Sequence, residues 1–332
     1  MKAKNTTPRS DLKAVLAALR AGRSFLVTTH VCPDGDAIGS VLAVRLFLDG
    51  LGKPDVTCAL DAPVPRIYQW LPGVESIIPP DRVTVAYDTV VLVDAATRDR
   101  VGRAADLIRP GHAVIVIDHH ADAQPEGDVN FVDGTYGSAG EIVAELFDLA
   151  RVPMTYDAAL CIYVALATDT GCFRFGNTGP RSHRTAAQLL EFGLDVHAIS
   201  NRLFDAMSPA QFQLVRRVFN SIRFHAQGRI AAARVTLQDL ADTGARQEDL
   251  NNLVNVGRNI DGVAVSILLR ETSDGQTKVS FRSRPPVDCA ALAAHFGGGG
   301  HPGAAGATVP HPLDAAYPMI VEYTTAHIGN AP

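Results

Sequence analysis

The 332-residue chain is poor in cysteine, tryptophan and net positive charge. Its five cysteines are odd in number and form no C-x-x-C pair, which argues against a disulfide framework and against a zinc site built on cysteine. The formal net charge of −5 argues against a partner that is a long nucleic-acid duplex held mainly by charge, because proteins of that class present a basic surface. A short anionic ligand held by a few local groups remains open.

Long apolar runs are also missing. No stretch reaches the length of a membrane helix, and the N-terminal segment MKAKNTTPRSDLKAVLAALRAG lacks the apolar core of a signal peptide. We therefore expect a cytoplasmic protein with no membrane partner. A composition of 47% hydrophobic and 20% charged residues is typical of a globular protein, and the length allows two domains.

The first half of the chain alternates short apolar runs with helical patterns. The runs SFLVTTH, DVTCAL, TVVLVDA and AVIVIDHH are rich in Val, Ile and Thr, as strands buried on both faces of a parallel sheet are. Segments with helical spacing, such as AIGSVLAVRLFLDGLG, lie between them. This alternation predicts an α/β fold with a doubly wound, mostly parallel sheet, in which ligands bind beyond the carboxyl ends of the strands.

A smaller α/β domain is expected after a helical stretch. Its strand candidates are RIAAARVTL, VAVSILLRE and TKVSFRSR, with the helical pattern QEDLNNLVNVGRNI between the first two. The glycine-rich segment HFGGGGHPGAAGA and a final helix near 313–327 follow. We interpret 1–194 as the first domain, 195–222 as a helical connector and 223–332 as the second domain.

Acidic and histidine side chains follow the predicted strands at several places. They are His30, Asp34 and Asp36 in TTHVCPDGDAIGS, Asp94 after VVLV, and Asp118, His119 and His120 at the end of AVIVIDHH; Asp169 ends an apolar helix. Taken singly, an aspartate here is commonly a helix cap or a turn former. Together on one rim, the carboxylates would repel one another unless cations compensate them.

A mixed set of carboxylates and imidazoles without thiolate suits Mn²⁺, with Mg²⁺, Zn²⁺, Co²⁺ or Fe²⁺ as alternatives. Six such ligands are too many for one catalytic ion with open positions, but they suffice for two ions that share a bridging carboxylate. We therefore expect two divalent metal ions.

The motifs HVCPDGDAIGS, VDAATRDR, VIDHH and TDTG, in this order, resemble those of the DHH phosphoesterase superfamily. The segment FGGGGHPGAAGA resembles the signature of the DHH-associated domain. In length and layout the chain is most similar to the branch of bifunctional oligoribonucleases (nanoRNases) and pAp phosphatases. The resemblance spans nearly the whole chain.

The resemblance implies roles for individual residues. His30 and Asp34 would bind one metal, Asp36, His119 and Asp169 the other, and Asp94 would bridge them. Three residues would act in catalysis, namely His120, which faces the substrate phosphate, Asp118, which orients its neighbours, and the bridging Asp94. Arg100 stands at the position of an arginine near the phosphate, although Arg98 is close enough to leave that choice open.

In the second domain, substrate binding is expected from Gly298, Gly299, Gly300 and His301, and from Arg258, Arg282 and Arg284. Consecutive glycines let backbone amides approach an anion closely, although a flexible linker is the alternative explanation. Arginines offer a bidentate fork to a terminal phosphate, although a solvated surface would explain each of them singly. The FRSR stretch predicts Arg282 and Arg284 on one strand face.

The activity implied is hydrolysis of very short RNA or DNA oligonucleotides to mononucleotides, together with dephosphorylation of pAp to AMP. A phosphodiesterase of pApA or c-di-AMP is an alternative that the sequence does not separate from this one. A catalytically silent nucleotide-binding module is the alternative from another class. The resemblance also implies a homodimer.

Overall fold

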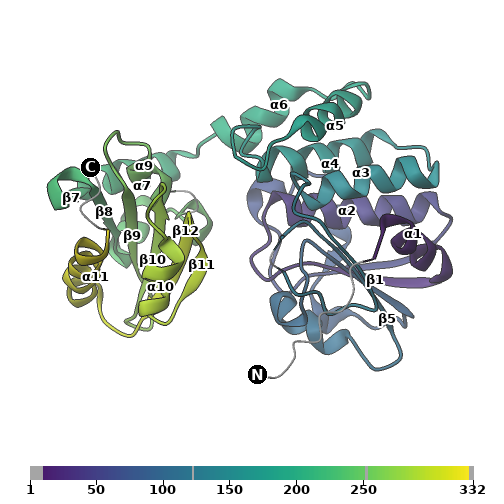
Figure 1. Ribbon diagram of the computed structural model, residues 1–332, viewed down its shortest axis with the longest axis horizontal. Helices are drawn as coiled ribbons and strands as arrows, with labels where there is room; N and C mark the ends of the chain where they lie inside the picture. The colour runs from purple at the N-terminus through teal and green to yellow at the C-terminus, as the bar shows by residue number, and fades with distance from the viewer. Residues whose placement is uncertain (1–9, 122, 251–252, 329–332) are drawn as a thin grey trace. The chain divides into compact units, whose positions relative to one another are not determined.

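The computed structural model describes residues 10–121, 123–250 and 253–328. The chain forms two compact units, Met1–Ala206 and Met207–Pro332, and each is described by itself (Figure 1). The division between them falls inside the segment interpreted as a connector. The domain boundaries at 194 and 222 stay a prediction. No helix in the described ranges is both long and apolar enough to cross a bilayer.

The first unit is built on a six-stranded sheet in which all neighbouring strands are parallel. The strands are β1 (Ser24–Thr28), β2 (Asp55–Ala59), β3 (Ile77–Ile78), β4 (Thr89–Val93), β5 (Ala113–Asp118) and β6 (Val129–Val132). Their order is β3-β2-β1-β4-β5-β6, so the winding direction reverses between β1 and β4. This confirms the predicted α/β fold. The sequence did not reveal β3 and β6, which are the short edge strands.

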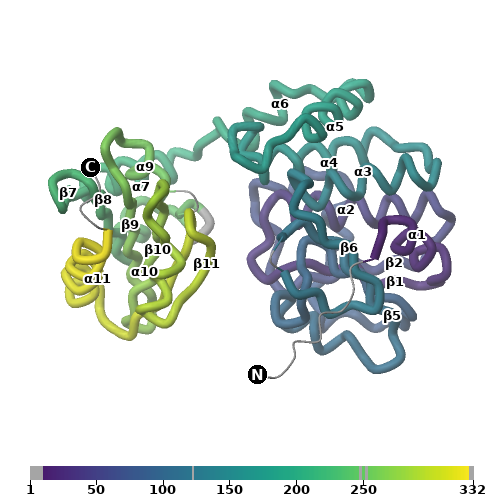
Figure 2. The backbone as a smooth tube through the Cα atoms, in the orientation of Figure 1, coloured from purple at the N-terminus to yellow at the C-terminus, as the bar shows by residue number. Residues whose placement is uncertain are grey.

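Helices cover one face of this sheet. They are α1 (Leu12–Ala21), α2 (Gly35–Gly50), α3 (Ala139–Ala150), α4 (Tyr156–Asp169), α5 (Pro180–Leu190) and α6 (Val196–Ser200). Figures 1 and 2 show α2, α3 and α4 side by side on that face, where they share a core with Phe25 and Val27 of β1. On the other face, 3₁₀ turns at Arg98–Leu107 pack over Leu26 and Val90. Burial on both faces explains why the strands are continuously apolar.

Helices α2 and α4 pack closely because small residues line their contact. A Cβ atom at Gly39 would collide with the backbone carbonyl of Cys161, and one at Gly35 with the side chain of Thr168. The first turn of α2 therefore lies against the last turn of α4. This packing brings acidic residues from the beginning of one helix and the end of the other to the same place.

The second unit contains a six-stranded mixed sheet in the order β11-β12-β10-β9-β8-β7, in which only β8 and β9 are parallel among the paired described strands. The strands are β7 (Arg223–His225), β8 (Ile230–Val235), β9 (Val265–Glu271), β10 (Thr277–Ser283), β11 (Gly299–His301) and β12 (Ala304–Val309). The helices are α7 (Pro209–Ser221), α8 (Leu237–Thr243), α9 (Val254–Arg258), α10 (Cys289–His295) and α11 (Leu313–His327). A second α/β domain was expected, and it is present.

Two local expectations in this unit need correction. The predicted helix across 247–260 is a 3₁₀ turn at Gln247–Leu250 followed by the short α9, and residues 251–252 lie outside the described ranges. The glycine run, expected to be a structured loop, forms the edge strand β11, which pairs with β12. A Cβ at Gly298 or Gly300 would collide with the backbone of β12, so the close approach of two strands requires glycine at both positions.

We expect Gly39→Ala to lower the free energy of unfolding by about 1–3 kcal/mol, because the added methyl group overpacks the contact between α2 and α4. Urea unfolding followed by circular dichroism measures this. The matched control is Gly176→Ala, because nothing lies within 4 Å of a Cβ built there. Equal stability of the two variants would contradict the close contact between these helices.

Candidate metal centre

The loop after β1 delivers the first two candidate ligands. His30 Nε2 lies 3.3 Å from Asp94 Oδ2 and 3.9 Å from Asp34 Oδ1. Asp34 is also the N-cap of α2, because its Oδ1 accepts a hydrogen bond of 3.0 Å from the backbone N–H of Ala37. The helix thus begins at Gly35, two residues before the expected start, and Asp34 rather than Asp36 caps it.

Asp36 is fully buried in the first turn of α2. Its carboxylate accepts hydrogen bonds from the Ser40 hydroxyl (2.8 Å) and from the backbone N–H groups of Ala139 (2.7 Å) and Gly140 (3.0 Å) at the beginning of α3. Burial, with nearby carboxylates adding to it, raises the pKa of Asp36 to about 7 against the opposing effects of His119 and the Ala139 amide. The helix N-terminus stabilises the ionised form only in part.

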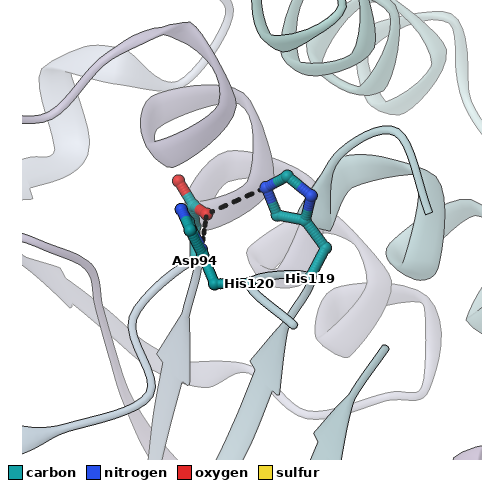
Figure 3. A group of neighbouring side chains, drawn as sticks. All are labelled: Asp94, His119 and His120. Atoms are coloured by element: carbon teal, nitrogen blue, oxygen red, sulfur yellow. Dashed lines mark ion pairs between the residues drawn. The ribbon is translucent and has the colours of Figure 1, made fainter. Parts of the chain in front are cut away.

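Asp94 occupies the centre of the group at the end of β4. Its backbone is left-handed, with φ of 54°, which is costly for a residue with a Cβ. Its side chain is buried, with Oδ2 toward His30 and Oδ1 3.6 Å from both His119 Nε2 and His120 Nδ1 (Figure 3). Burial, together with the charges of Asp36, Asp34, Asp118 and Asp169, raises its pKa well above the ordinary value.

His119 joins the carboxylates on the other side of Asp94. Its Nε2 lies 3.6 Å from Asp36 Oδ2 and 3.5 Å from Asp169 Oδ2. Asp169 is the last residue of α4, where the helix dipole disfavours a negative charge. Burial raises the pKa of Asp169, and the nearby His119 and a hydrogen bond of 3.0 Å from Asn177 Nδ2 oppose the rise.

Asp118 and His120 form a tight pair at the end of β5. Asp118 Oδ1 lies 2.7 Å from His120 Nδ1 and accepts the backbone N–H groups of His119 (2.7 Å) and His120 (3.2 Å). Burial opposes ionisation of Asp118, but the hydrogen bond and charge of His120 outweigh it and lower its pKa. In return, the hydrogen bond that His120 donates to Asp118 raises the pKa of His120. In Figure 3, dashed lines join the Asp94 carboxylate to both His119 and His120.

The structure thus brings the six predicted ligands into two groups joined by Asp94. His30, Asp34 and Asp94 offer ligand atoms within 4.8 Å of one another, and so do Asp36, His119 and Asp169; a third such group is Asp94, His119 and His120. Asp94 Oδ1 and His119 Nε2 are buried without a hydrogen-bond partner among the described residues. Buried polar atoms rarely lack a partner, and these two are good metal ligands. The cluster therefore fits divalent metal ions.

The segment that carries Arg98 and Arg100 is fixed to the loop after β1. The Arg100 carbonyl accepts a hydrogen bond of 2.8 Å from the backbone N–H of Val31, next to His30. Asp61, after β2, pairs with Arg103, and Gly102 adopts φ of 58° against Asp61 and Val31. The charge of Arg100 contributes to the pKa of His30, which burial lowers, and to that of His120. The Arg98 backbone N–H instead donates to Glu126.

The predicted substrate residues of the second unit are the arginines at the ends of α9 and β10 and the glycines and histidine of β11. Arg284 Nη2 donates to the Arg258 carbonyl (3.0 Å), and Arg282 donates to its own strand at the Phe281 carbonyl (2.9 Å). Arg284 directly follows β10, and its backbone N–H donates to the Ala264 carbonyl (3.1 Å); that Arg282 and Arg284 share a strand face stays a prediction. Gly299, Gly300 and His301 form β11, with Gly298 directly before it.

Sequence reasoning missed several residues that complete these sites. Asn177 donates to Asp169, and the Tyr136 carbonyl lies 3.3 Å from His119 Nδ1; neither residue had a spacing signal that would reveal it. A cavity of about 440 Å³ in the second unit is lined by Arg270, Lys278 and Gly298, among others. Arg270 and Lys278 oppose each other on β9 and β10, a cross-strand pairing visible only once the register is known.

We expect the metal-free protein to lose stability as the pH rises from about 5 to 8. Asp36, Asp94 and Asp169 have raised pKa values, so the folded state binds more protons than the unfolded state between the ordinary pKa near 4 and the raised values. Each such proton contributes at most about 1.4 kcal/mol per pH unit. His120, with a raised pKa, acts in the same direction, whereas His30, with a lowered pKa, opposes the trend.

Thermal unfolding in a chelator and in excess Mn²⁺ checks this expectation. The two melting curves should diverge with rising pH, because deprotonated ligands bind metal and the metal then stabilises the folded state. Asp94→Asn should flatten the pH dependence seen in the chelator. A melting temperature that rises with pH in the chelator would contradict the assignment.

Comparison with known proteins agrees with this geometry. Residues 24–166 match the DHH family, N-terminal domain, and residues 215–323 match the DHHA1 domain. The chain is 36% identical over 297 residues to the bifunctional oligoribonuclease and PAP phosphatase NrnA of Thermus thermophilus, covering 89% of this chain and 87% of that protein. It is 28% identical to the Bacillus subtilis protein of the same name, with coverages of 86% and 89%.

A solved structure, that of an exopolyphosphatase-related protein from Bacteroides fragilis, aligns with a TM-score of 0.86 and 25% identity. The alignment covers 95% of this chain and 96% of that one. The similarity therefore extends over both units of the chain. The resemblance drawn from the motifs is confirmed: this protein belongs to the DHH family, in the branch of the bifunctional oligoribonuclease and PAP phosphatases.

Proposed function

We propose that this protein is a two-metal phosphoesterase that hydrolyses very short oligonucleotides to mononucleotides and dephosphorylates pAp to AMP. The observation that carries the proposal is the position of Asp94, whose two oxygens face two separate groups of ligands. The similarity to bifunctional oligoribonuclease and PAP phosphatases supports the substrate class. We further propose that the protein acts as a homodimer.

The proposed ligands divide as the geometry groups them. His30 and Asp34 would hold one ion, Asp36, His119 and Asp169 would hold the other, and Asp94 would be shared by both. Carboxylate and imidazole donors without thiolate favour Mn²⁺ among the candidate metals. Two bound cations would supply a hydroxide at neutral pH and neutralise charge on the phosphate.

The chain's own residues then bind and orient the phosphate. Asp118 keeps the His120 imidazole oriented through Nδ1 and raises its pKa, which favours the charged form. The proposed role of His120 is to neutralise negative charge on the phosphate oxygens. Arg100, held next to His30 by the Val31 hydrogen bond, adds a second positive charge on the same side.

The second unit is also proposed to bind phosphate groups of the substrate. Arg258, Arg282 and Arg284 are the proposed phosphate contacts, with His301 and the glycines of β11 beside β12. Burial lowers the pKa of Arg282, with the charge of Arg258 adding to the effect. Positively charged guanidinium groups near one another are suited to an anionic ligand between them.

Initial rates with Mn²⁺ and a set of substrates test the proposal directly. The set is pAp, pApA, c-di-AMP and RNA from dimers to 24-mers. We expect hydrolysis of pAp and of dinucleotides to be fastest and the rate to fall steeply with length. A preference for c-di-AMP would favour the alternative phosphodiesterase, and absence of turnover with every substrate would favour the silent binding module. Asp94→Asn should lower kcat by at least about 1000-fold and serves as the control for a contaminating nuclease.

Arg100 and Arg98 give a matched pair of variants. Arg100→Ala should lower kcat/KM for pAp by about 10- to 1000-fold, since one charged donor to a phosphate is lost. Arg98→Ala should keep kcat/KM within about threefold of the parent value. The hydrogen bond between Arg98 and Glu126 uses the backbone N–H of Arg98 and therefore survives the substitution. The reverse ranking would transfer the phosphate contact to Arg98.

A further inference from the structure

One exposed aromatic side chain stands on a segment that carries the metal cluster. Phe175 is 47% exposed, six residues after Asp169. Burying a phenylalanine is normally favourable, so an exposed ring beside a group of ionisable residues needs a reason. The described residues contribute no aromatic partner to this ring.

The loop that bears Phe175 is anchored at both ends on the same carboxylate. It leaves Asp169 at the end of α4 and returns at Asn177, whose Nδ2 donates to the Asp169 carbonyl (3.2 Å), to Asp169 Oδ2 (3.0 Å) and to the Gly137 carbonyl (3.0 Å). A loop closed on Asp169 in this way keeps its tip within a few residues of the cluster. The Phe175 backbone, whose N–H donates to the carbonyl of Thr170 (3.0 Å), is therefore held close to Asp169, one of the proposed ligands.

The backbone of this loop is strained and rigid. Gly171, Cys172 and Phe173 are left-handed in succession, with φ of 56°, 57° and 62°. The Thr170 hydroxyl accepts the Phe173 N–H, the Thr170 carbonyl accepts the N–H groups of Arg174 and Phe175, and Arg174 Nε donates to the Gly171 carbonyl (2.7 Å). Left-handed residues with a Cβ cost roughly 1–2 kcal/mol each and persist where the surroundings enforce them, often at binding sites.

The two phenylalanines of the loop point in different directions. The Phe173 ring packs against the core and stacks on His183, with ring centroids 5.3 Å apart and planes at 25°. The Phe175 ring instead lies over Gly171, where a Cβ would strike it, and turns its other face to solvent. The Phe175 ring thus packs on Gly171 with one face and is exposed to solvent on the other.

We propose that Phe175 is a stacking platform for the nucleobase next to the phosphate that is hydrolysed. This inference rests on the proposed function, because the metal cluster fixes where that phosphate lies. Stacking on an aromatic face accepts any base, so the platform would favour nucleotides over other phosphate esters without selecting a sequence. Of the two rings in this loop, that of Phe175 is the exposed one.

The test compares ligands with and without a base. In the parent enzyme with Mn²⁺, we expect AMP to bind more tightly than ribose 5-phosphate in titration calorimetry. For pAp hydrolysis, Phe175→Ala should raise KM about 5- to 100-fold with kcat changed less than threefold. The abasic analogue of pAp, with hydrogen in place of adenine, should be hydrolysed equally well by both proteins.

Two further variants distinguish a base-stacking role of Phe175 from a structural role in packing over Gly171. Phe175→Tyr should keep the parent KM, whereas Phe175→Leu, which still covers Gly171, should behave like Phe175→Ala. Phe192→Ala, at a ring 39% exposed in the turn after α5, is the matched control and should change nothing. Parental KM in Phe175→Leu, or equal binding of AMP and ribose 5-phosphate, would overturn the platform. Lack of pAp turnover by the parent would instead refute the proposed function.

Discussion

The architecture of the first unit depends on the electrostatics of a few carboxylates that are buried together. Asp36 and Asp94 are buried, and Asp169 lies beside them at the unfavourable end of a helix. Charges at this separation repel strongly where water is excluded, and no lysine or arginine forms an ion pair with these three acids among the described residues. Such a group is stable in its ionised form only with cations, and the imidazoles of His30 and His119 complete a ligand set for them.

The topology explains why these side chains meet. Parallel strands put all their carboxyl ends on one edge, and the winding direction reverses between β1 and β4, which is where ligands bind in open α/β sheets. His30 follows β1, Asp94 follows β4, and His119 follows β5. Helices α2 and α4 then add Asp36 and Asp169, and they can do so only because glycine and small residues let their backbones approach. Packing of the helices is thus part of the metal site.

The parts of this arrangement that were predictable are those that depend on chemistry repeated along the chain. An apolar run that ends in Asp or His predicts a buried strand and, at its carboxyl end, a candidate metal ligand. The fold and the candidate ligands could therefore be predicted together. What depends on contacts between distant segments was not predictable. The amides of Ala139 and Gly140 that bind Asp36, the Asn177 amide on Asp169 and the pairing of Arg270 with Lys278 come from register and packing. The glycine run was predictable as a special backbone, but not as a strand that needs glycine to approach β12.

The negative net charge of the protein bears on how this site binds a phosphate. A chain of net charge −5 with an acidic cluster would repel a phosphate ester unless bound cations reverse the local sign. Substrate and metal must then favour each other's binding, since a coupling free energy acts equally in both directions. The positive groups on this rim, His120 and Arg100, are too few to bind a phosphate against that many carboxylates alone. The carboxylates therefore confer dependence on metal, while in the proposed roles His120, Arg100 and the exposed face of Phe175 would determine which phosphate ester is bound.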